Sequence, residues 1–77
     1  MRALPKKVYL GQDWEITVTV VEPAVMGAAF TGEDAGAWDK TTRTILILKG
    51  ISRERQWSVY CEELAHALID KLTDKGH

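Results

Sequence analysis

The sequence predicts an α+β domain in which a small, mainly antiparallel sheet of three or four strands packs on one long C-terminal helix. Residues 14–20 alternate apolar and polar side chains, as in a strand with one buried face. Residues 45–48 are all apolar, which is typical of a central strand that is covered on both faces. Between residues 52 and 75, apolar side chains recur every three or four positions, as on one side of a helix. The 77 residues therefore predict a single domain over 1–77.

The other strands are shorter, and the ends of the chain are polar. Val8–Leu10 is an apolar run that stops at Gly11, while Gly27–Phe30 and Ala37–Asp39 are candidates for short strands. Pro23 ends the strand over 14–20. Residues 1–7 are polar and contain a proline, and we expect them to be flexible.

The long helix has recognisable signals at its start and along its length. Ser52 is a good N-cap, and Glu54 places a negative charge in the first turn. The apolar positions predict that one stripe faces the sheet, made of Trp57, Cys61, Leu64, Leu68 and Leu72. On this interpretation Cys61 is a buried, inert thiol, and Leu68→Ala costs about 2–5 kcal/mol of stability.

Composition and charge disfavour several classes of partner and environment. Ten basic and eleven acidic side chains give a net charge of -1, so no basic surplus is present to neutralise a nucleic-acid backbone. No apolar run approaches the roughly 18 residues that span a membrane. The N-terminus lacks the apolar core of a signal peptide, and the one cysteine fits a reducing compartment. We therefore expect a cytoplasmic protein without a membrane or nucleic-acid partner.

The pentapeptide Glu62-Glu63-Leu64-Ala65-His66 matches the zinc-protease pattern HExxH, with Glu62 in place of the first histidine. A strand over 44–48 precedes it, followed by a short polar link and the helical stretch 61–70. In this arrangement the region from Gly36 to Asp70 resembles the small zincin-like metallopeptidases of phages and mobile elements.

The resemblance implies roles for three residues. Glu63 corresponds to the general base, and Glu62 and His66 to metal ligands for zinc. The family also uses a third ligand downstream, and we expect none here because only eleven residues follow His66. On the residues alone, Glu62, His66 and Asp70 form a solvated helical face with ordinary i, i+4 contacts.

Two functions follow from these residues. The first is a non-catalytic protein-binding module on a degenerate zincin-like scaffold, with no cofactor. It would be encoded by a phage or mobile element and would inhibit a host protein or defence system in the host cytoplasm. The alternative is a zinc-dependent hydrolase with Glu63 as base, completed by another subunit.

The turn-rich stretch around Trp38 is the predicted partner surface. An exposed Trp38 would anchor a protein partner, since tryptophan is enriched at binding hot spots, and acidic side chains would form its polar rim, namely Glu33, Asp34 and Asp39. The other interpretation is that Trp38 caps the small core. A homodimer is compatible with the sequence.

Overall fold

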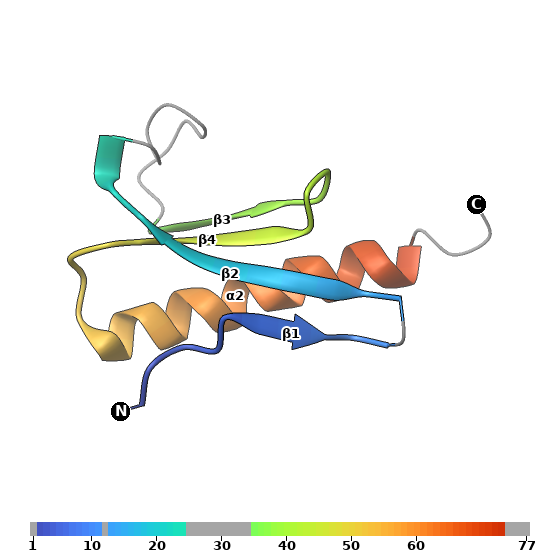
Figure 1. The fold of residues 1–77 in the computed structure, drawn as a ribbon, viewed down its shortest axis with the longest axis horizontal. Helices are drawn as coiled ribbons and strands as arrows, with labels where there is room; N and C mark the ends of the chain where they lie inside the picture. Colours follow the sequence, from blue (N-terminus) through green and yellow to red (C-terminus); the bar gives the residue numbers. More distant parts are fainter. Residues whose placement is uncertain (1, 12, 25–34, 74–77) are drawn as a thin grey trace.

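The computed structural model describes residues 2–11, 13–24 and 35–73 and confirms the predicted α+β architecture. Four strands form one mixed, mostly antiparallel sheet in the order β1-β2-β4-β3, and α2 lies across one of its faces (Figure 1). The strands and the helix have these bounds: β1 Lys7–Tyr9, β2 Glu15–Val21, β3 Gly36–Asp39, β4 Thr44–Leu48 and α2 Arg53–Thr73. The candidate strand at Gly27–Phe30 lies outside the described residues.

The central position of β4 follows from its sequence. Its five residues are threonine and large aliphatic side chains, and Ile45 and Ile47 are fully buried. It pairs antiparallel with β3, with Trp38 opposite Ile45, and parallel with β2, with Val18 opposite Ile45. The predicted central strand is therefore confirmed, and the one parallel pair in the sheet joins β2 to β4.

Ser52 caps the N-terminus of α2 as predicted, because its Oγ accepts a hydrogen bond of 3.1 Å from the backbone N–H of Arg55. The helix packs mainly on β3 and β4. Its buried residues are Val59, Tyr60 and Ala67, and Trp57 and Leu64 add partial contacts to the core.

The predicted core stripe of α2 is partly wrong. Cys61, Leu68 and Leu72 are exposed, so Cys61 is not a buried thiol and Leu68 is not a core position. The helix is rotated so that the side through Val59, Tyr60 and Ala67 faces the sheet. The reason lies in β3, where Gly36 contributes no side chain: a Cβ built there would lie 2.2 Å from Cγ1 of Val59. So close an approach leaves no space for a larger side chain at this point of the contact.

The N-terminal residues join the fold. Lys7 begins β1, Leu4 packs against the core, and the indole N–H of Trp57 donates a 2.6 Å hydrogen bond to the carbonyl of Arg2. No helix in the described part of the chain is long and apolar enough to cross a bilayer.

Candidate functional site

The HExxH-like segment lies in the middle of α2 and divides between two environments. Glu62 and His66 are both exposed, one helical turn apart on the outer side. Glu63 is half-buried and faces β3: its Cγ lies 3.3 Å from a Cβ built on Gly36. The two candidate ligands therefore share a face, while the candidate general base turns toward the sheet.

The residues present supply an incomplete donor set for zinc. A catalytic zinc site uses three protein ligands and keeps a fourth position for water or substrate. Glu62 and His66 would provide two of the three. Within residues 2–11, 13–24 and 35–73, no three His, Cys, Asp or Glu side chains lie close enough together to hold a metal ion. The site as described does not fit a catalytic zinc ion.

Asp70 does not belong to a solvated face, which corrects the interpretation from the helical wheel. It is half-buried and accepts a hydrogen bond from the indole N–H of Trp38 on β3. This bond ties the C-terminal half of α2 to the edge of the sheet. The sequence did not predict this hydrogen bond, because 32 residues separate Trp38 from Asp70. The one signal in the sequence was an acidic residue on the long helix.

The predicted partner residues have different environments. Trp38 is half-buried and packs against the core, as in the interpretation that it caps the core. Oδ1 of Asp39 accepts hydrogen bonds from the backbone amides of Thr41 and Thr42, at 2.9 and 3.4 Å, and so organises the turn between β3 and β4. Glu33 and Asp34 lie outside the described residues.

A polar cleft lies beside this turn. It has a volume of about 330 Å³ and is lined by Trp14, Lys40, Thr41, Arg43, Asp70 and Thr73. The guanidinium carbon of Arg43 lies 4.3 Å from the centre of the Trp14 ring, in a cation–π arrangement. Arg43 also has a positive φ of 53°, an uncommon conformation for this residue, and donates to the carbonyl of Asp13. These contacts hold Arg43 against the protein. They join the turn between β3 and β4 to the segment that precedes β2.

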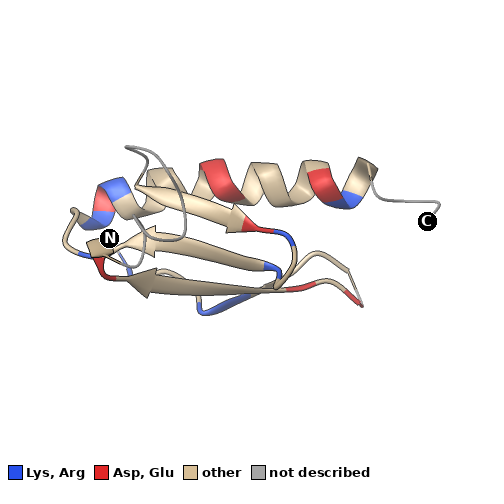
Figure 2. Cartoon of the chain, turned by 90° about the horizontal axis from the view of Figure 1, so that it is seen from above, with Lys and Arg blue, Asp and Glu red and all other residues tan. Residues whose placement is uncertain are grey.

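The outer side of α2 carries an apolar surface that the core does not use. We call it the outer α2 face and define it by Cys61, Ala65, Leu68, Ile69 and Leu72, all of which are exposed. The exposed fractions of Leu68, Ile69 and Leu72 are 44%, 56% and 57%. Charged positions of both signs occur along α2 and at the strand ends (Figure 2). Three of these residues, Cys61, Leu68 and Leu72, were predicted to face the sheet, so their exposure was not predicted.

Comparison with protein-family models, curated proteins and solved structures yields no match to this chain.

Proposed function

We propose that this protein is a protein-binding module and that the outer α2 face is its binding surface. The observation that carries the proposal is the exposure of Leu68, Ile69 and Leu72 together on one side of one helix. Burying an exposed leucine or isoleucine fully is worth about 1.5–3 kcal/mol, so a partner that covers this half-exposed group gains on the order of 1 kcal/mol per side chain.

The spacing of the outer α2 face indicates what kind of partner fits. Cys61, Ala65, Leu68 and Leu72 follow one another at intervals of four, three and four residues. This is the spacing of a helix seam that packs against another helix. The partner we infer is an amphipathic helix, whose apolar stripe would lie along the seam with Glu62 and His66 at its rim. The small side chains of Cys61 and Ala65 would accept its larger ones.

On the strength of the sequence resemblance, we propose that the scaffold is a degenerate zincin-like one, encoded by a phage or mobile element. In that setting the helix would belong to a host protein, including one that serves in defence, which the module would inhibit by occupying its surface. A second copy of the chain is the other source of such a helix.

Photo-crosslinking from Cys61 tests the proposal, because it is the only cysteine and lies on the proposed surface. A benzophenone attached to Cys61 should give one discrete adduct, with the purified chain or in an extract of the source cells. The adduct should disappear in Leu72→Asp and persist in Tyr9→Ser, which changes an exposed large residue on β1. Absence of any adduct, or equal adducts in both variants, would overturn the proposal.

One observation favours the alternative, a zinc-dependent hydrolase. Glu62 and His66 are exposed and one turn apart, which is the placement of two ligands for a single ion. Another subunit would supply the third ligand, and zinc would polarise the water for which Glu63 acts as base. The half-buried position of Glu63 against β3 requires its side chain to turn outward for this role.

A further inference from the structure

Among the described residues, the edge of β2 toward β1 is open over its second half. β1 has only three residues and pairs with Glu15–Thr17, whereas β2 continues to Val21. The last backbone bond on this side runs from the N–H of Val18 to the carbonyl of Lys6. The N–H of Thr17 and the carbonyl of Val21 bond toward β4. Because alternate residues of a strand bond to opposite neighbours, the N–H and carbonyl of Val20 point to the β1 side, beyond the end of β1.

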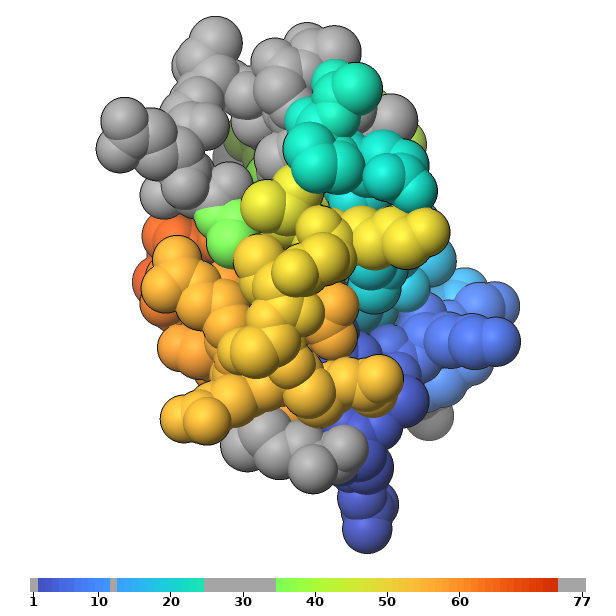
Figure 3. All heavy atoms as spheres, turned by 90° about the vertical axis from the view of Figure 1, so that its left-hand side faces the viewer, coloured from blue at the N-terminus to red at the C-terminus, as the bar shows by residue number. Residues whose placement is uncertain are grey.

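The N-terminal segment leaves this edge open for an identifiable reason. Pro5 has no N–H to donate to a ladder, and the bond from Trp57 to the carbonyl of Arg2 holds the preceding residues toward α2. The residues that precede Lys6 therefore diverge from β2. Between the diverging segments lies a groove of about 650 Å³, lined by Ala3–Lys7, Thr17–Val20, Arg53 and Gln56. Figure 3 shows the N-terminal segment in blue, β2 in cyan and the start of α2 in gold on this side of the molecule.

The groove combines apolar walls with positive charge. Leu4, Pro5 and Val20 provide apolar surface, and Val20 is 44% exposed. Lys6, Lys7 and Arg53 line the groove, and no acidic side chain of the described residues does.

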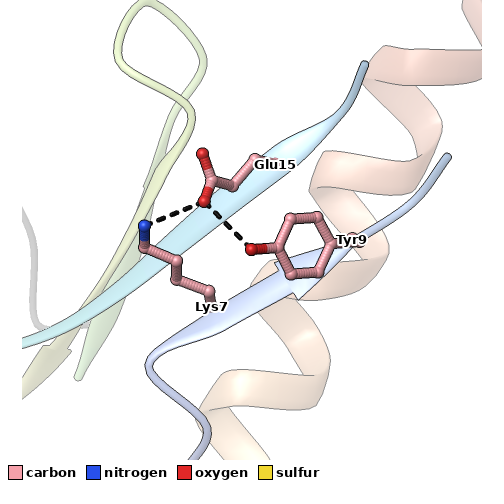
Figure 4. A network of polar contacts seen from close by, with 3 residues as sticks. All are labelled: Lys7, Tyr9 and Glu15. Carbon is pink, nitrogen blue, oxygen red and sulfur yellow. Dashed lines mark hydrogen bonds and ion pairs between the residues drawn. The ribbon is translucent and has the colours of Figure 1, made fainter. Parts of the chain in front are cut away.

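These cations differ in whether they are already paired. Nζ of Lys7 lies 2.9 Å from Oε1 of Glu15, which also accepts a hydrogen bond from Tyr9 (Figure 4). Lys6 and Arg53 form no ion pair with a carboxylate in the described part of the chain. Two positive charges therefore remain to attract a ligand.

We propose that this groove binds an extended acidic segment of a partner protein, which adds to the sheet beside the second half of β2. The N–H and carbonyl of Val20 would bond its backbone, as in other cases of strand addition to an open edge. Its side chains would alternate, because successive residues of a strand point to opposite faces. Carboxylates on the α2 side of the sheet would reach Lys6 and Arg53, with their aliphatic stems against Leu4 and Val20. This site is separate from the outer α2 face and does not depend on the function proposed for that face.

The test uses the purified full chain and a labelled peptide of alternating glutamate and valine. We expect saturable binding by fluorescence anisotropy, which weakens as salt is added, and a shift of the Val20 amide signal in NMR spectra. Arg53→Glu and Lys6→Glu should each weaken binding at least fivefold. Lys40→Glu makes the same charge change at an exposed turn outside the groove and should leave the affinity within twofold.

Two further probes separate strand addition from simple charge attraction. The same peptide N-methylated at its central valine should bind at least fivefold more weakly, because it lacks a backbone donor. A peptide of alternating lysine and valine should not bind. Lack of saturable binding, equal affinity of the methylated peptide, or an equal loss in Lys40→Glu and Arg53→Glu would overturn the proposal. Leu72→Asp changes the outer α2 face and should leave the affinity for the peptide unchanged. Failure of the groove proposal can therefore be distinguished from failure of the function proposed for the outer α2 face.

Discussion

At the scale of single residues, Gly36 determines how α2 meets the sheet. A Cβ at this position would lie 2.2 Å from Cγ1 of Val59 and 3.1 Å from the carbonyl oxygen of Leu46. The helix can approach β3 only because that atom is missing. The sequence marks Gly36 as part of a turn-rich stretch, and it gives no sign that the residue packs beneath a helix.

Gly36→Ala should therefore destabilise the protein, by about 1–3 kcal/mol for overpacking of a tight contact. Urea unfolding followed by circular dichroism measures this change. Ala65→Ser also adds one heavy atom to a small residue, but at an exposed position of α2, and it should have little effect. Equal stability of Gly36→Ala and the original chain would show that α2 lies farther from β3.

The charged pair beside the groove gives a prediction about pH. The hydrogen bond and charge of Lys7 lower the pKa of Glu15 below its usual value. A carboxylate with a lowered pKa in the folded state contributes stability above its unfolded pKa, and loses this contribution as pH falls through the lowered value. In an NMR titration, Lys7→Met should raise the pKa of Glu15 toward the usual value. Lys49→Met removes a lysine that pairs with Glu22, and it should leave the pKa of Glu15 unchanged. If the pKa of Glu15 did not change in Lys7→Met, the pairing of Lys7 with Glu15 would be refuted.

At the scale of elements, α2 has two apolar sides, and the sequence does not say which one is buried. Its extent and N-cap could be predicted, because period and capping are local properties. The sides could not be separated, because a stripe through Trp57, Tyr60, Leu64 and Ala67 and a stripe through Cys61, Ala65, Leu68 and Leu72 both have helical spacing. The shape of β3 decides between them, and this shape is a tertiary property.

Two alanine substitutions test the assignment of the helical sides. Leu68 is 44% exposed, so Leu68→Ala should cost about 1 kcal/mol or less, and not the 2–5 kcal/mol of a core position. Ile45 is fully buried at the centre of the sheet, and Ile45→Ala should cost about 2–5 kcal/mol. Chemical denaturation of both variants measures the difference. A cost for Leu68→Ala similar to that for Ile45→Ala would place Leu68 in the core.

At the scale of the whole molecule, one helix covers only part of a four-stranded sheet. α2 packs mainly on β3 and β4, so Val20 stays exposed although it shares a strand face with buried Ile16 and Val18. In the described part of the chain, the second half of β2 also retains an open edge, because β1 is short. The α+β class and the central strand could be predicted from alternation and hydrophobicity. The parallel pairing of β2 with β4, the bond between Trp38 and Asp70, and the groove could not, because each depends on segments distant in sequence.

The side of α2 that points away from the sheet is exposed in the described structure. The predicted metal ligands Glu62 and His66 lie there beside the outer α2 face. Glu62 and His66 were correctly recognised as neighbours on one helical face. Their surroundings were not predictable, since the apolar residues beside them were assigned to the core. We therefore propose that this face contacts a protein partner, with Glu62 and His66 at its rim.

A calorimetric titration of the purified chain with zinc tests this assignment most directly, with His66→Ala measured beside it. We predict no stoichiometric zinc binding at micromolar concentration and equal stability of the two proteins, because His66 is an exposed side chain. One zinc ion bound per chain and lost in His66→Ala, with peptide hydrolysis that disappears in Glu63→Gln, would contradict the account and establish metal chemistry on α2.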